Sequence, residues 1–139
     1  MPILSTEVEK MLLNFKCDNF KSFREGFDFN MVPEKRMSEL SYSILKETIA
    51  GEEETGLSAS VIYGPNAAGK TSIVNAMSCM RQIVLRGNIR DASDDRSGDH
   101  VSDNLRLAPF AFQDDAALIG FDVTFTSSGM KYHDVVSFF

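Results

Sequence analysis

The clearest binding motif of the chain is residues 64–71. They read Gly-Pro-Asn-Ala-Ala-Gly-Lys-Thr and match the complete GxxxxGK[ST] pattern. Such a loop binds phosphate, because its glycines let the backbone curl round the anion while its amides point inward. Lys70 then places an ammonium on the terminal phosphates, and the Thr71 hydroxyl is the expected Mg²⁺ ligand. The pattern predicts ATP, or another nucleotide, and Mg²⁺ as ligands of Gly64, Pro65, Asn66, Ala67, Ala68, Gly69, Lys70 and Thr71.

The residues on either side of this loop are those that a phosphate-binding loop needs. Residues 59–63 are short, β-branched and aromatic, which predicts a buried strand. Between Ile73 and Leu85 apolar residues recur with a helical period, and Gly87 is a natural end. The helix would add the positive end of its dipole to the loop. The alternative is a glycine-rich turn that matches the pattern without binding anything.

Composition describes a globular protein without obvious nucleic-acid or membrane chemistry. The 139 residues are 43% apolar and 24% charged, with a net charge of −6 and no basic run. No apolar stretch approaches the roughly 20 residues that span a membrane. Cys17 and Cys79 stand in no metal or redox spacing, which predicts two reduced, packed thiols in a cytoplasmic protein.

The remaining segments predict a β-rich chain around the loop. Residues 1–10 are interpreted as an N-terminal extension, 11–16 as a strand, 17–22 as a hairpin connection and 23–31 as a half-buried strand. Residues 37–45 fit either a short helix or an extended segment. Residues 51–56 are acidic and flanked by glycine, which predicts a solvated loop.

Beyond the helix, the sequence predicts a polar loop followed by antiparallel strands. Residues 91–100 are interpreted as an acidic surface loop, and 105–139 as an antiparallel β region. Within that region, 105–112 resemble an edge strand, and 121–125 and 130–139 form a hairpin. The two histidines have no partner motif and are expected to be ordinary surface or packing residues. Because the chain stops inside an apolar run, we expect it to be cut within a domain.

Hydrolysis of ATP would require a carboxylate at the end of a buried strand to hold Mg²⁺. Residues 118–122 are the best candidate, but Gly120 interrupts the strand and Val123 follows Asp122 where a second acid is expected. Their alternation favours a two-faced hairpin strand instead. The sequence thus predicts nucleotide binding and leaves catalysis open.

Several segments together resemble the start of ABC-class P-loop ATPases. They are residues 14–16, 19–23, 27–29 and 61–72, and the closest likeness is to the SMC, RecF and OLD relatives. Within that group the chain is most similar to prokaryotic AAA-type ATPases of abortive infection and phage defence. The resemblance covers residues 11–139. It implies an α/β P-loop NTPase fold, an incomplete ABC-type N-terminal lobe with a mixed sheet and an antiparallel β subdomain.

The resemblance also implies further site residues and partners. It adds Ser72 and Lys21 to the nucleotide site and directs Asn66 towards the γ-phosphate. The family's signature motif, Walker B carboxylates and switch histidine are expected beyond residue 139. In such families ATP lies between two lobes, which implies a homodimer through the ATPase domain and an effector partner such as a nuclease or toxin.

Three hypotheses therefore remain from the sequence. The first is an ATP-binding part of an ABC-class ATPase, and the second is a module that uses the nucleotide as a ligand switch without hydrolysis. The third is a remnant whose loop folds but binds nothing. No base-reading motif distinguishes ATP from GTP.

Overall fold

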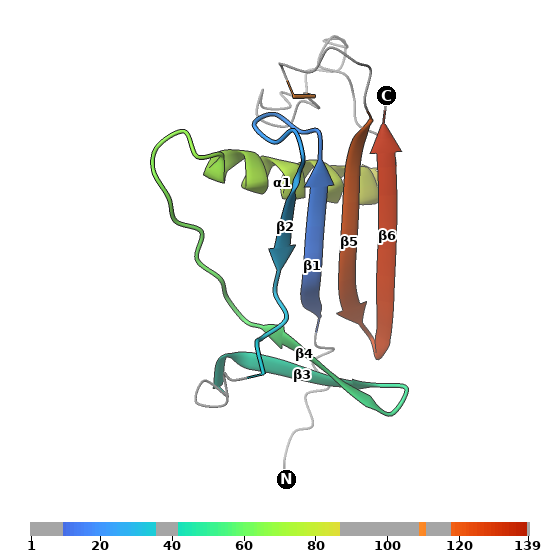
Figure 1. The fold of residues 1–139 in the computed structure, drawn as a ribbon. Helices are drawn as coiled ribbons and strands as arrows, with labels where there is room; N and C mark the ends of the chain where they lie inside the picture. Colours follow the sequence, from blue (N-terminus) through green and yellow to red (C-terminus); the bar gives the residue numbers. More distant parts are fainter. Residues whose placement is uncertain (1–9, 36–41, 87–108, 111–117, 139) are drawn as a thin grey trace. The chain divides into compact units, whose positions relative to one another are not determined.

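The computed structural model describes residues 10–35, 42–86, 109–110 and 118–138. This part of the chain contains six strands and one long helix, with four strands before the helix in the sequence and two after it (Figure 1). In chain order the elements are β1 (Met11–Asp18), β2 (Phe27–Asn30), β3 (Ile44–Ile49), β4 (Glu52–Leu57), α1 (Lys70–Arg86), β5 (Ile119–Ser127) and β6 (Met130–Phe138).

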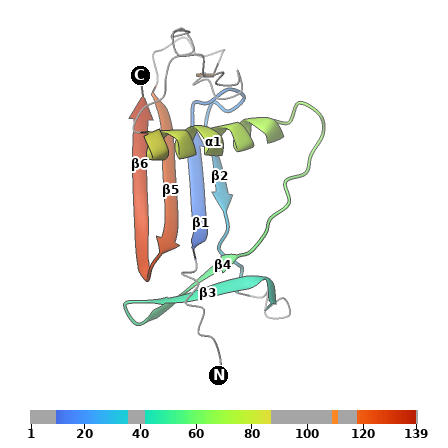
Figure 2. The ribbon, with the colours of Figure 1, turned by 180° about the vertical axis from the view of Figure 1, so that it is seen from behind.

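Two sheets are formed by these strands. Four strands pair in the order β2-β1-β5-β6, and neighbouring strands run in opposite directions (Figures 1 and 2). The other sheet is the antiparallel hairpin of β3 and β4, in which Ile44 is opposite Leu57 and Ile49 is opposite Glu52. The prediction of a protein with both helix and strands is confirmed. The described strands pair antiparallel, so this part of the chain does not show the predicted mixed sheet.

The chain divides into two compact units, each with its own share of the four-stranded sheet. The first unit takes its described residues from Met1–Phe15, Phe29–Val61 and Asp122–Asp134, and the second from Lys16–Asp28, Ile62–Phe121 and Val135–Phe139. The β3–β4 hairpin therefore belongs to the first unit. The second unit contains α1 and the loop of residues 64–71.

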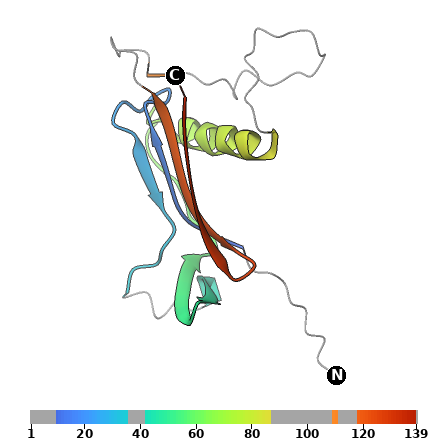
Figure 3. The same cartoon turned by 90° about the vertical axis from the view of Figure 1, so that its right-hand side faces the viewer.

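The core of the second unit lies where α1 covers one face of the sheet (Figure 3). Phe20 is fully buried, and its ring meets that of Phe121 edge-on with 5.7 Å between centroids. The inward face of α1 contributes small and sulfur-containing side chains at helical spacing, namely Ala76, Cys79 and Met80. The predicted helix is confirmed, although three of its apolar residues, Val74, Val84 and Leu85, are exposed and do not belong to the buried face.

A tight turn follows β1 and leads towards β2. Phe20 and Phe23 exchange two backbone hydrogen bonds of 3.0 and 2.9 Å, and Lys21 at the tip has a φ of 48°. Gly26 (φ 80°) is required on steric grounds, since a Cβ there would collide with the carbonyl of Cys17. The strand β1 continues to Asp18, so the predicted connection at residues 17–22 begins too early.

Asn19 fixes the start of this turn with its side chain. It adopts a φ of 51°, which asparagine tolerates better than most residues, and it is 4% exposed. Its Nδ2 donates to the carbonyl of Leu118 at 3.4 Å, and its Oδ1 accepts from the amide of Phe110 at 3.1 Å. One side chain thus holds three separate segments of the second unit together.

In the first unit, the β3–β4 hairpin is tied to the turn between β5 and β6. Glu47 accepts a hydrogen bond of 2.8 Å from the amide of Gly129, and Lys131 lies 2.7 Å from Glu54. A further ion pair, Lys46 with Glu53 at 3.0 Å, crosses the hairpin itself. The loop predicted at residues 51–56 is therefore wrong, because Glu52, Glu53 and Glu54 lie on the strand β4.

The other strand predictions are confirmed in part. β2 is the half-buried strand expected within residues 23–31, and β5 and β6 form the hairpin expected at the end of the chain. Of residues 37–45, for which a short helix and an extended segment were both open, residues 37–41 lie outside the described part and only 44–45 lie on a strand, at the start of β3. The predictions for residues 1–9, 91–100, 105–108, 111–112 and 139 lie outside the described part.

The strand predicted just before the phosphate loop is wrong. Residues 59–63 are irregular, and Val61 and Tyr63 are 82% and 89% exposed. Apolar, β-branched residues favour a strand, but a strand forms only where a neighbour supplies hydrogen-bond partners. The described part of the chain provides no such neighbour for residues 59–63.

The two cysteines are buried free thiols, as predicted. Burial, reinforced by the charge of Asp18 and by Cys79, raises the pKa of Cys17 from 9.0 to about 12. Burial also raises the pKa of Cys79, although the charge of Lys21 opposes that shift. Both groups are therefore expected to remain protonated thiols at neutral pH, which makes them poor nucleophiles.

The raised pKa of Cys17 predicts a loss of stability in alkali. Above pH 9 the thiol ionises in the unfolded chain but not in the folded one, so the unfolded state is favoured as pH rises from about 9 to 12. The free energy of unfolding should fall by up to about 1.4 kcal/mol per pH unit in this range. Urea unfolding of the wild type and Cys17→Ala at pH 7 to 11 measures this, and equal slopes in both proteins would contradict it.

Candidate functional site

The loop of residues 64–71 lies at the start of α1. Residues 64–69 form no regular element, and the helix begins at Lys70 (Figure 2). Residues 64–68 are exposed, whereas Gly69 and Lys70 are half-buried. No acidic residue lies in the first turn of α1, so the positive end of the helix dipole is not neutralised there. This end of the helix is consequently suited to an anion.

The ammonium of Lys70 turns back onto its own loop. It donates two hydrogen bonds of 2.7 Å, one to the carbonyl of Gly64 and one to that of Pro65. The amide of Ala68 adds a weaker bond of 3.3 Å to the carbonyl of Pro65. The positive charge is thus held beside the backbone that would surround a bound phosphate.

Two residues of the loop have left-handed backbone conformations. Ala67 has a φ of 65°, which costs an alanine about 1 kcal/mol. Gly69 has a φ of 86°, and a Cβ on it would lie 2.8 Å from Cζ of Phe23. Gly69 is required for both reasons, while Gly64 meets nothing closer than 3.6 Å and is not sterically required in this structure.

The two hydroxyl residues after the lysine differ in their surroundings. Thr71 is exposed, as a side chain that binds Mg²⁺ from solvent must be. Ser72 is 8% exposed, and its Oγ lies 3.0 Å from Oγ of Ser22 in the turn after β1. The structure thus brings the 19–26 turn and the start of α1 into direct contact.

Besides Ser72, the family resemblance singled out Lys21 and Asn66 in this region. Lys21 lies at the tip of the turn, with Nζ 5.4 Å from the centroid of the Phe20 ring. Burial raises the pKa of Cys79 on α1, and the positive charge of Lys21 partly opposes that rise. Asn66 is exposed in the loop. Both residues belong to the unit that holds the phosphate loop.

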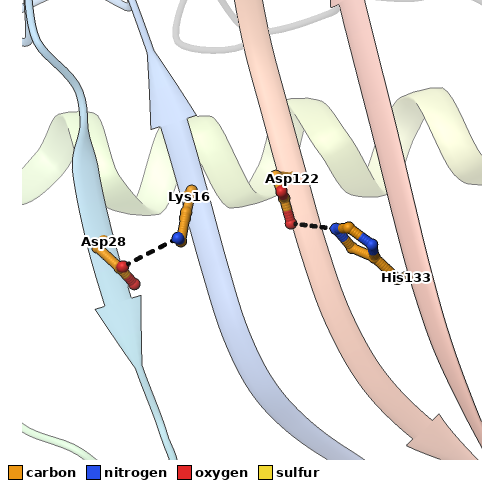
Figure 4. Close-up of polar contacts among 4 residues, drawn as sticks. All are labelled: Lys16, Asp28, Asp122 and His133. Atoms are coloured by element: carbon orange, nitrogen blue, oxygen red, sulfur yellow. Dashed lines mark hydrogen bonds and ion pairs between the residues drawn. The ribbon is translucent and has the colours of Figure 1, made fainter.

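Asp122, the rejected candidate for a catalytic carboxylate, lies on the hairpin strand β5 as predicted. Its Oδ1 is 2.9 Å from Nε2 of His133 on β6, and the pair is partly exposed (Figure 4). A second pair, Lys16 with Asp28 at 3.3 Å, joins β1 to β2 (Figure 4). Cross-strand pairs of this kind stabilise sheets modestly. They account for Asp122 and His133 without any catalytic role.

One contact at this site was missed by sequence reasoning, namely that of Phe23 with Gly69. A phenylalanine in an alternating segment indicates a strand, and nothing in the sequence indicates that its ring reaches a distant glycine. The only signal in the sequence was that the motif requires glycine at position 69. This requirement predicts that a side chain there would collide with a neighbour, but it does not identify the neighbour.

The described residues were also compared with the requirements of a metal site and of a membrane span. Among them, no group of three or more His, Cys, Asp or Glu side chains gathers as a metal site would require. In the same residues, no helix has the length and apolar character to cross a membrane. No protein-family model matches the chain, and comparisons with curated proteins and with solved structures find no match either.

Proposed function

We propose that this chain binds a nucleoside triphosphate with Mg²⁺ through residues 64–71. The observation that carries the proposal is the complete GxxxxGKT loop at the start of α1, with the Lys70 ammonium held at the loop. Exposed amides, an ammonium and the positive end of a helix dipole together attract a multiply charged phosphate.

Each residue type in the loop has a distinct part in this proposal. Lys70 exchanges its carbonyl partners for phosphate oxygens, and the amides near the helix start donate to the β- and γ-phosphates. The exposed Thr71 hydroxyl fits an oxygen ligand of Mg²⁺, with the phosphates supplying others. When bound, Mg²⁺ neutralises phosphate charge that one lysine cannot balance.

The finer proposal is that the loop belongs to the N-terminal lobe of an ABC-class ATPase. Its support is the arrangement of motifs in residues 14–29 and 61–72. From this follow, as proposals of the same kind, a P-loop NTPase fold, a homodimer around ATP, a cytoplasmic location and an effector partner in phage defence. A Walker B carboxylate and signature motif would complete hydrolysis in that assembly.

A second candidate is a module that binds the nucleotide without hydrolysing it. The specific observation in its favour is the pairing of Asp122 with His133 on a hairpin strand. A carboxylate in such a pair has a structural partner across the sheet, which accounts for its presence without requiring hydrolysis.

Titration calorimetry of the chain with Mg-ATP tests the proposal, with Mg-GTP for comparison and phosphate release followed in parallel. Saturable binding is the expected result. Binding without phosphate release favours the non-hydrolysing module, and release above a no-protein control favours a catalytic group. No saturable heat with either nucleotide, in a chain shown to be folded by circular dichroism, would overturn the proposal.

A further inference from the structure

We propose that Phe23 is a positioning residue, which holds Gly69 and hence the phosphate loop in a binding-ready conformation. The inference rests on the proposed function, since the loop matters because it binds nucleotide. Phe23 itself is not assigned any contact with the ligand. Its action is mechanical and passes through the backbone of Gly69.

The geometry of the contact supports this role. A Cβ built on Gly69 would lie 2.8 Å from Cζ of Phe23 and 3.4 Å from both Cε1 and Cε2. Because the two Cε atoms are equidistant and only slightly farther away than Cζ, this position lies over the face of the ring near its tip. The tip of the ring therefore occupies the space into which Gly69 would have to move, and close packing resists that movement.

The position of Phe23 is itself fixed by the core of its unit. Its backbone exchanges two hydrogen bonds with Phe20, which is fully buried against Phe121. The ring of Phe27 lies beside it, with 4.8 Å between centroids. The turn of residues 20–23 is thus held in place by the buried Phe20. Phe23 is fixed with it and limits the movement of the phosphate loop at Gly69.

A neighbouring contact fixes the same junction from the helix side. Ser22, the residue before Phe23, lies within 3.0 Å of Ser72 in the first turn of α1. The turn therefore contacts Gly69 just before Lys70 and Ser72 just after Thr71. These two contacts bracket the lysine and the threonine that the ligand needs.

Preorganisation explains why such a support should affect affinity. Residues 64–68 are exposed and hold their shape mainly through bonds within the loop. If Gly69 were free to move, the loop would become ordered only on binding. The free-energy cost of that ordering would lower the affinity for the ligand. A displacement of about 1 Å in a site of this kind costs up to about a hundredfold.

The test uses Phe23→Leu, which keeps an apolar side chain beside Phe27 but removes the atoms that reach Gly69. Its matched control is Phe125→Leu, because Phe125 is also half-buried and also has a ring partner, Tyr132, at 5.1 Å. Amide NMR spectra of the nucleotide-free proteins give the first measurement, and Mg-ATP calorimetry the second. Thermal unfolding shows whether both variants lose similar stability.

We expect Phe23→Leu to shift or broaden the amide signals of Gly69, Lys70 and Thr71 and to weaken Mg-ATP binding about tenfold or more. Phe125→Leu should leave both unchanged. Unmoved loop signals in Phe23→Leu would overturn the positioning role, whatever the affinity. If the signals move but the wild type binds no nucleotide, the support of the loop stands and the proposed function falls.

A double-mutant cycle isolates the contact from the backbone strain. Gly69→Ala introduces both a collision with the ring and an unfavourable φ, whereas in Phe23→Leu only the φ penalty remains. The added alanine should therefore cost less affinity, and shift fewer loop signals, in the Phe23→Leu background. Equal effects in both backgrounds would contradict a direct contact between the ring and Gly69.

Discussion

Lys70→Ala is expected to reduce Mg-ATP binding by about two orders of magnitude or more while leaving the chain folded. Hydrogen bonds to a charged group contribute about 1.5 to 3 kcal/mol each, and the ammonium can make at least two to a triphosphate. Its loss also leaves the phosphate charge opposed only by Mg²⁺ and backbone dipoles. The fold should persist, because the side chain contacts only carbonyls of an exposed loop.

Calorimetry with Mg-ATP measures this effect, and Lys46→Ala is the matched control. Lys46 is also a partly exposed lysine with a near partner, Glu53, but it lies in the first unit on the β3–β4 hairpin. Its removal should leave the affinity unchanged. Wild-type affinity in Lys70→Ala would contradict binding through residues 64–71, because the lysine of this motif reaches the β- and γ-phosphates.

Phe20→Ala is expected to destabilise the chain by about 3 to 5 kcal/mol. Phe20 is fully buried, and its truncation would leave a cavity beside Phe121 in the core of the second unit. The turn of residues 20–23 would lose its anchor as well. Because the free energy of unfolding of a whole domain is only about 5 to 15 kcal/mol, this substitution should remove a large part of the stability of the fold.

Urea unfolding followed by circular dichroism checks the size of this loss. Phe125→Ala provides the comparison, since Phe125 is half-buried and should cost markedly less. A Phe20→Ala midpoint equal to that of Phe125→Ala would show that Phe20 is not packed as the structure has it.

Local sequence patterns predicted those elements whose residues interact mainly with their neighbours in the chain. The helical period of α1 and the alternating aromatic residues of β5 were recognisable, and Ala76, Met80 and Phe121 are among their buried members. The phosphate loop was recognisable because its function demands fixed residue types at fixed spacing. Cys17 and Cys79 were correctly expected to be packed thiols from their spacing alone.

The errors arose where a structure depends on partners that are distant in sequence. Residues 59–63 have strand composition, but pairing is decided by other strands, and the described part supplies none. Residues 51–56 were predicted to be a solvated loop because of their glutamates and flanking glycines, yet Glu53 and Glu54 lie on a strand and pair with Lys46 and Lys131. The contact of Phe23 with Gly69 joins two segments that no local pattern connects.

The two carbonyl partners of Lys70 have a consequence for which anions can enter the loop. At rest the ammonium is already solvated by its own backbone, so an arriving ion has to compete with two peptide dipoles. A singly charged ion gains little from that exchange, whereas a chain of phosphates replaces both dipoles with stronger charges and more contacts. If the loop binds phosphate as proposed, we therefore expect it to select ligands by charge, with polyphosphates displacing the two carbonyls more readily than singly charged anions.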